Sequence, residues 1–132
     1  MTDDLKLGRR AGLPDSLRVL LDEHPRDLWE SHDNFDGLTR FWLERHLMFR
    51  ALIERIAGES RAIADRRADP ERATRATARF AQLLLSELHG HHRIEDLHYF
   101  PRLAALEPRL QRGFDILDHD HHALDGHLAA LA

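Results

Sequence analysis

Hydrophobic side chains recur at intervals of three and four residues along two long stretches before residue 101, the spacing of one face of an α-helix. The first stretch begins near Asp36, and its apolar positions are Leu38, Phe41, Trp42, Phe49, Ile53, Ile56 and Ile63. The second begins at Asp69-Pro70-Glu71, because a capping Asp followed by Pro and an acidic residue is a strong helix start. It is expected to run to about Phe100, before Pro101, with a short turn following to Glu107.

A third stretch, opened by Pro108, has the most regular pattern. Its inward positions alternate between spacings of 4 and 3 and are Leu110, Phe114, Leu117, His121, Leu124, Leu128 and Leu131. His121 is the single polar member of this stripe, so we expect it to face the core and to have a partner there. No strand-like alternation is found in the sequence, and the pattern predicts an all-α protein.

The segment before the first long helix lacks such a stripe. Residues 1–13 are expected to form a loose polar arm, and Asp15 or Ser16 to cap a short helix that runs to about His24, where Pro25 ends it. Residues 25–34 indicate an irregular connection. The expected organisation is an arm with a short helix at residues 1–34, followed by a helical domain at residues 35–132.

The composition excludes several classes of protein and argues against others. The 132 residues suffice for one domain with its own core, and the absence of cysteine excludes disulfides, thiolate sites and iron–sulfur clusters. The net charge of −4 argues against nucleic-acid binding, which needs a basic surface. No apolar run approaches the roughly 20 residues of a membrane span, and no secretory signal precedes the first helix. We therefore expect no membrane association and a cytoplasmic location.

Histidine supplies the candidate chemistry. Eight of the eleven histidines fall in two clusters, between residues 89 and 98 and between residues 119 and 127. His91 and Glu95 are four residues apart, as are His121 and Asp125, so each pair shares one face of a helix. Imidazole nitrogen and carboxylate oxygen together are a ligand set for iron, zinc, copper or manganese. Since His46 lies on the apolar side of the first long helix, three helices are able to deliver imidazole to one metal site.

The other histidines are expected either on the surface and in loops or at undecided positions. The surface or loop histidines are His24, His32, His89, His119 and His127. His92 and His98 remain undecided, and Asp96 is expected to point away from the inward face. Arg45 and Arg50 are expected to form solvated pairs on the helix surface. Glu95 and His98 also match the Glu-x-x-His spacing of ferritin-like carboxylate bundles, but a second such motif and two further glutamates are not evident, so that interpretation is weaker.

Three segments, taken in order, resemble the hemerythrin-like (HHE cation-binding) family. Residues 91–96, His-His-Arg-Ile-Glu-Asp, with Tyr-Phe-Pro at residues 99–101, resemble that family's His-His-x-x-Glu-Glu segment before a Phe-Pro. Residues 41–50 resemble its first helix, which carries one histidine ligand, and residues 120–125 resemble its third helix. The similarity spans about residues 36–131.

The resemblance implies an up-down antiparallel helix bundle holding two non-heme irons. In this chain the bundle would have three long helices and the short N-terminal helix. The ligand positions that correspond to the family pattern are His46, His91, Glu95, His121 and Asp125. The family's fourth helix, with its own His-x-x-x-Glu, has no counterpart before Ala132. We therefore expect either a shortened form of a longer domain or a bundle closed by a partner chain.

These features favour a non-heme iron protein that binds or senses oxygen, nitric oxide or iron, with zinc as an alternative metal. Two alternatives remain open at this point. One is a diiron enzyme acting on peroxide or nitric oxide, and the other is a metal-free helical dimerisation module. Three amphipathic helices leave one apolar face uncovered, so a homodimer is expected.

Overall fold

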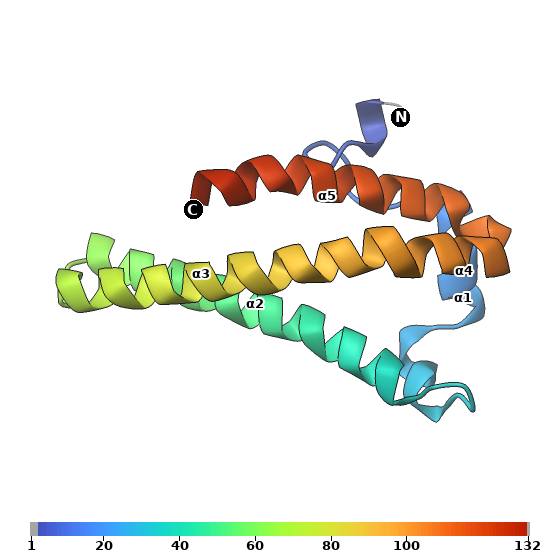
Figure 1. The fold of residues 1–132 in the computed structure, drawn as a ribbon, viewed down its shortest axis with the longest axis horizontal. Coiled ribbons are helices and arrows are strands. Elements are labelled where there is room, and N and C mark those ends of the chain that lie inside the picture. Colours follow the sequence, from blue (N-terminus) through green and yellow to red (C-terminus); the bar gives the residue numbers. More distant parts are fainter. Residues whose placement is uncertain (1–2, 132) are drawn as a thin grey trace. The chain divides into compact units, whose positions relative to one another are not determined.

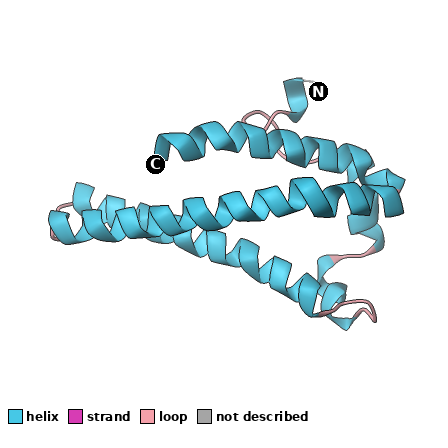
Figure 2. Ribbon diagram, viewed as in Figure 1, coloured by secondary structure: helices cyan, strands magenta, loops and turns pink. Residues whose placement is uncertain are grey.

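A computed structural model describes residues 3–131 of the chain, and every regular element in that range is helical (Figure 1, Figure 2). The α-helices are α1 (Val19–Glu23), α2 (Gly37–Ala64), α3 (Pro70–Ile94), α4 (Phe100–Leu106) and α5 (Gln111–Leu131). The other helical elements are 3₁₀ turns at Asp3–Leu5, Asp15–Leu17, Arg26–Ser31 and Pro108–Leu110, and a π-helical turn at Glu95–Tyr99. The predicted all-α class, with three long helices and a short N-terminal one, is confirmed.

The predicted starts of the first two long helices are confirmed by their caps. The Asp36 carboxylate accepts a hydrogen bond from the backbone N–H of Thr39 at 2.9 Å, which caps α2. The Asp69 carboxylate accepts from the backbone N–H of Arg72 at 2.8 Å and caps α3 in the same way. Each carboxylate satisfies an N–H group that has no acceptor within its helix, so these two residues fix where the helices begin.

Two expectations about the connecting segments are wrong. The helical run does not stop at Phe100 but passes through Pro101 and continues as α4 to Leu106. Pro101 is the second residue of α4 and follows the π-helical turn Glu95–Tyr99 almost directly. The expected irregular connection is also partly ordered, because Arg26–Ser31 forms a 3₁₀ turn and Trp29 Nε1 donates to the His24 carbonyl at 2.6 Å.

The chain forms two compact units, and each is described by itself. The first, the hairpin unit, comprises Asp36–His91 and Leu131, and the second, the arm unit, comprises the segment up to Phe35 together with His92–Ala130. No helix in the described residues is long and apolar enough to cross a membrane.

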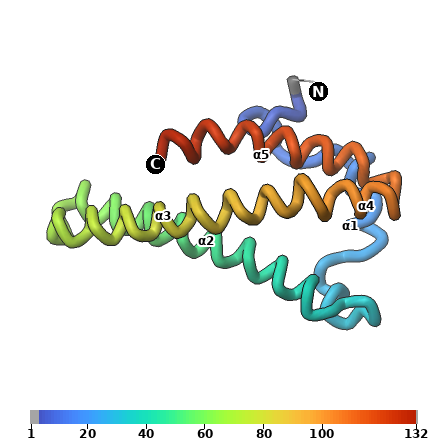
Figure 3. The backbone as a smooth tube through the Cα atoms, in the orientation of Figure 1, coloured from blue at the N-terminus to red at the C-terminus, as the bar shows by residue number. Residues whose placement is uncertain are grey.

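In the hairpin unit, α2 and α3 run antiparallel and pack through a small apolar core. Phe49 and Leu52 of α2 meet Leu84 of α3 there, with partly buried side chains around them. The tube in Figure 3 shows the tight reversal between the two helices. At that reversal Arg66 has a φ of 54°, and the Arg67 N–H bonds the Ala62 carbonyl at 2.9 Å. This left-handed residue and its hydrogen bond end α2 in a Schellman-type motif.

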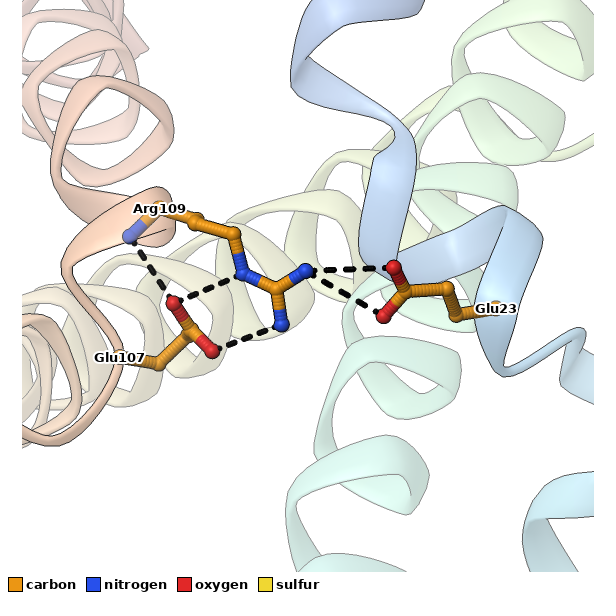
Figure 4. A network of polar contacts seen from close by, with 3 residues as sticks. All are labelled: Glu23, Glu107 and Arg109. Atoms are coloured by element: carbon orange, nitrogen blue, oxygen red, sulfur yellow. Dashed lines mark hydrogen bonds and ion pairs between the residues drawn. The ribbon is translucent and has the colours of Figure 1, made fainter.

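In the arm unit, the N-terminal segment is held against α5, contrary to the expected loose arm. Leu5 is buried, and Arg10 forms an ion pair with the buried Asp120 of α5. Arg109 also connects distant segments. Its guanidinium binds Glu107, two residues earlier, and Glu23 at the end of α1 (Figure 4). These pairs tie residues before α2 to residues after α3.

The inward face of α5 differs from the predicted stripe. His121 is buried as expected, but Leu117 and Leu131 are exposed while Ile116 and Asp120 are buried. Ile116 and Asp120 are four residues apart and share one side of the helix. The pattern of apolar residues alone did not show that Arg10 would pair with Asp120 and bury this side of α5.

Candidate metal centre

Two histidine side chains face each other in the hairpin unit. His46 of α2 and His91 of α3 have their Nε2 atoms 3.3 Å apart, and their rings meet edge to face. The Nδ1 of His46 lies 2.8 Å from the Trp42 carbonyl one turn earlier in α2. Because a carbonyl oxygen only accepts, the hydrogen is assigned to Nδ1, and Nε2 of His46 keeps its lone pair.

Aromatic side chains surround the His91 ring. The Trp42 ring lies 4.5 Å from it and the Phe49 ring 5.1 Å, measured between ring centroids. Only 4% of His91 is exposed, whereas His46 is exposed at the outer side of the pair. The His91 ring is therefore held by packing, and the low polarity of its surroundings strengthens electrostatic attraction between a cation and its ligands.

An ion pair crosses the hairpin one turn away from this pair. Arg45, which precedes His46, binds Glu87 of α3, and its guanidinium lies 5.5 Å from the Phe41 ring centroid. Both partners are only partly exposed, so the expectation of a solvated surface pair is wrong for Arg45. The pair fixes the rotation of α2 against α3 and thereby helps to align His46 with His91.

The arm unit contains a second cluster around His121. The Nδ1 of His121 lies 2.8 Å from Asp96 Oδ1, and its Nε2 lies 3.7 Å from Glu95 Oε2. Its ring stacks on the His92 ring at a centroid distance of 3.8 Å and an interplanar angle of 8°. The Phe100 ring lies 5.7 Å away. His121 thus has the partner that its position in an apolar stripe required.

Asp96 and His92 were not found by the sequence argument. Asp96 was expected to point away from the inward face, which is wrong, and His92 was undecided but is buried. Two signals were available in the sequence. His92 and Asp96 are four residues apart, as His91 and Glu95 are, and Asp96 occupies the second carboxylate position of the family segment quoted above.

The π-helical turn explains the error over Asp96. Glu95 is its first residue, and π-helical hydrogen bonds span five residues instead of four. More residues per turn means a smaller angle between successive side chains than in an α-helix. Consecutive carboxylates, Glu95 and Asp96, are therefore both able to reach His121, which the regular 3.6-residue period does not predict.

The five candidate ligands fall into distinct environments. His46 and His91 come together in the hairpin unit, and Glu95 lies near His121 in the arm unit. Asp125, one turn after His121 on α5, is exposed. The histidines expected on the surface are exposed in the structure, and so is His98; these are His24, His32, His89, His98, His119 and His127.

Groups with raised pKa values lie near His121 on both of its sides along α5. The hydrogen bond from Arg10 to Asp120 raises the pKa of Arg10 above its ordinary value. The exposed His122 lies 2.7 Å through Nδ1 from the Asp118 carbonyl, and this contact, with the nearby Asp118 carboxylate, raises the pKa of His122. His121 therefore lies between a buried ion pair and a solvent-facing imidazole.

Taken together, the site residues are those of a helical protein that binds a metal cation. The hairpin unit presents the imidazoles of His46 and His91, and the arm unit presents the imidazole of His121 beside the carboxylates of Glu95 and Asp96. Imidazole nitrogen and carboxylate oxygen are donors that suit divalent iron, zinc or manganese. Residues 37–132 match the family model described as the hemerythrin HHE cation binding domain. The chain belongs to the hemerythrin HHE family. No curated protein and no solved structure matches it.

Proposed function

We propose that this protein holds non-heme iron between its helices and binds or senses oxygen or nitric oxide at that metal. The observation that carries the proposal is the pair of facing Nε2 atoms of His46 and His91. Two imidazoles brought tip to tip across a helix pair, one of them embedded in aromatic rings, are suited to share a cation. One imidazole is buried and the other exposed, so the facing nitrogens are reachable from solvent on the His46 side.

The first metal would be held by His46, His91 and Glu95. Glu95 follows His91 by one turn in the same helical run, so its carboxylate is the natural third ligand beside this imidazole. Two histidines and one carboxylate are the donor set of many non-heme iron(II) sites, and they leave further coordination positions open. Zinc is the alternative occupant of the same donor set.

The second metal would be held by His121 and Asp125, with Glu95 shared between the two ions. Glu95 Oε2 lies 3.7 Å from His121 Nε2, so the same carboxylate that follows His91 also approaches the imidazole of α5. Asp125 is exposed and one turn from His121, so its side chain is free to turn toward a cation. The proposed site therefore contains two irons.

The choice of oxygen or nitric oxide as ligand rests on the ligand set. Three imidazoles and two carboxylates place less negative charge on iron than a carboxylate-rich site does. We expect such a site to favour reversible binding of a small diatomic molecule over strong oxidative chemistry. Iron bound here would supply an open coordination position, and the aromatic rings of Trp42 and Phe49 beside His91 would keep water from that side.

The test is metal content by mass spectrometry on protein purified without a histidine tag, combined with an absorption spectrum. We expect His46→Ala and His91→Ala each to lose most of the bound iron. The matched control is His89→Ala, which removes an exposed imidazole two residues before His91 on the same helix and should keep wild-type iron. Equal iron in all three variants would reject the proposed site.

The same sample distinguishes the number and kind of metal. About two irons per chain, with near-ultraviolet bands of a bridged pair, would support the two-metal site. One metal per chain that survives His121→Ala would limit the site to His46, His91 and Glu95. Stoichiometric zinc after growth in iron-rich medium would contradict the choice of iron. Spectral shifts on adding oxygen or nitric oxide to the iron(II) form would support the proposed ligand class.

A further inference from the structure

Asp96 of the π turn forms a hydrogen bond with the His121 imidazole of α5. We propose that Asp96 is a positioning residue, which holds His121 in the tautomer and ring orientation that present its Nε2 to the cation. This inference rests on the proposed metal site. It concerns a residue that is not itself counted among the ligands.

The first step is the chemistry of the hydrogen bond. Asp96 Oδ1 lies 2.8 Å from His121 Nδ1, and an ionised carboxylate only accepts hydrogen bonds. In the imidazole form with a single ring hydrogen, which is the form that binds a metal, that hydrogen is therefore assigned to Nδ1. This leaves the lone pair on Nε2, the nitrogen that lies 3.7 Å from the Glu95 carboxylate. Metal-ligating histidines characteristically donate their second ring N–H to a carboxylate or a backbone carbonyl.

The second step is a comparison with the Nδ1 contacts of three other histidines, of which His32 accepts a hydrogen bond from the nearby Asn34 backbone N–H at 3.1 Å. His46 and His122 both place Nδ1 against a carbonyl of their own helix, at Trp42 and Asp118. His121 instead reaches a carboxylate on another element. Its ring is thereby set by a tertiary contact, so its orientation depends on the π turn that carries Asp96.

The third step is the fixing of the ring plane. The His92 ring lies parallel to that of His121 at 3.8 Å, and Phe100 lies against it at 5.7 Å. Asp96, His92 and Phe100 all belong to the helical run from α3 into α4. The hydrogen bond to Asp96 sets the rotation of the imidazole within its plane, and the stacked rings set the plane itself. Together they direct Nε2 toward Glu95.

The test begins with the metal-free protein, in which the tautomer of His121 is read from the ¹⁵N chemical shifts of its ring. We expect a hydrogen on Nδ1 in the wild-type protein, whereas a solvated histidine favours Nε2. Asp96→Ala removes the acceptor, so the hydrogen should move to Nε2. Asp96→Asn keeps an acceptor oxygen at the same reach and should retain the wild-type tautomer.

The second readout is the affinity for iron(II), measured without oxygen by competition with a chromophoric chelator. Loss of a carboxylate that orients a ligand typically costs about 10- to 100-fold in metal affinity. We expect a loss in this range for Asp96→Ala and a smaller one for Asp96→Asn. The matched control is Asp118→Ala, which removes an exposed carboxylate beside His122 on α5 and should leave both the His121 tautomer and the affinity unchanged.

The outcomes separate this inference from the proposed function. Wild-type protein that binds iron, with unchanged affinity and tautomer in Asp96→Ala, would overturn the inference and leave the metal site standing. Wild-type protein that binds no iron would overturn the proposed function, and the role of Asp96 toward a metal with it. If Asp96→Ala does not fold, as judged by circular dichroism, the tautomer of His121 in Asp96→Asn tests the inference in its place. Loss of the Nδ1 hydrogen in that variant would overturn the inference, since its amide oxygen remains an acceptor.

Discussion

Arg10 in the N-terminal segment and Asp120 in α5 form an ion pair across 110 residues of sequence. Side-chain exposure is 15% for Arg10 and 6% for Asp120, and both guanidinium Nη atoms donate to the carboxylate. Arg10 also donates to the Leu5 carbonyl at 2.9 Å, and Leu5 is itself buried. The segment before α1 is therefore a structural part of the arm unit.

We predict that Arg10→Ala lowers the free energy of unfolding by about 3 kcal/mol, because it leaves the Asp120 carboxylate buried without its counter-charge. Chemical denaturation followed by circular dichroism measures this change. The matched control is Arg18→Ala, whose ion pairs at 3.9 and 4.0 Å are exposed, and this variant should change stability by less than about 0.5 kcal/mol. Equal effects of the two substitutions would show that the buried pair does not stabilise the unit.

The hairpin unit depends on a small core, which makes it sensitive to single truncations. Leu84 is 4% exposed and packs against Phe49 and Leu52. Leu84→Ala removes buried apolar volume and should cost about 3 kcal/mol of unfolding free energy. Its neighbour Leu83 is 46% exposed, so Leu83→Ala should cost less than about 1 kcal/mol. Thermal unfolding of the two variants side by side tests whether α2 and α3 are held together by this core.

Local signals were sufficient to predict where α2 and α3 begin and to select His46 and His91 as inward histidines. The caps at Asp36 and Asp69 act on backbone groups three residues away, so sequence spacing alone reveals them. The same reasoning marked His46 and His91, since each lies on the apolar side of a long amphipathic helix. Their approach then follows once the two helices pack as neighbours.

The features that were missed depend on non-local contacts or on departures from regular geometry. The π turn changes the angular spacing after Ile94, so a 3.6-residue period placed Asp96 on the wrong side. The pairing of Arg10 with Asp120 joins segments 110 residues apart, and no local pattern connects them. Pro101 ordinarily signals a helix end, but here it opens α4 directly after the π turn.

Glu107 gives the protein an acid-sensitive contact. Its carboxylate accepts hydrogen bonds from Arg109 side-chain and backbone groups, and these lower the pKa of Glu107 from 4.5 to about 2 (Figure 4). Since the folded-state pKa lies below the unfolded value, the stabilisation is fully present above pH 4.5 and is lost as the pH falls toward about 2. Arg109 also donates to Glu23 of α1, so one guanidinium contacts both carboxylates.

We predict that Arg109→Ala raises the pKa of Glu107 toward 4.5, as measured by NMR titration of its side-chain carboxyl carbon. The stability difference between wild-type protein and this variant should shrink as the pH is lowered from 4.5 toward 2. Arg102→Ala, which removes an exposed arginine of α4, should leave this titration unchanged. An unchanged Glu107 pKa in Arg109→Ala would contradict the assignment of these hydrogen bonds.

The first turns of α2 carry apolar side chains that remain exposed. Leu38 and Phe41 are each 49% exposed, although helical spacing places them on the same side as the buried Phe49. The face of α2 that packs at Phe49 is thus solvent-exposed at Leu38 and Phe41. An exposed apolar surface of this kind commonly marks an interface. We propose that a second copy of the chain covers it.

Light scattering coupled to size exclusion should accordingly give a dimer mass for the wild-type protein. Replacing Leu38 and Phe41 together by Glu should give a monomer with unchanged helical content. Leu47→Glu is the control, because Leu47 is 55% exposed but lies on another side of α2. A wild-type monomer across the accessible concentration range would contradict the homodimer.

Metal removal provides the last prediction, because a cation that bridges α2 and α3 binds the folded protein and not the separated helices. At a free metal concentration about 100 times the dissociation constant, binding to the folded state adds about 2.7 kcal/mol to its stability. A chelator should therefore lower the midpoint of thermal unfolding of the iron-loaded wild-type protein. The same chelator should have no effect on His91→Ala, which lacks the buried imidazole, and should act on His89→Ala as on the wild-type protein. A chelator effect of equal size in His91→Ala would place the stabilising metal somewhere other than between His46 and His91.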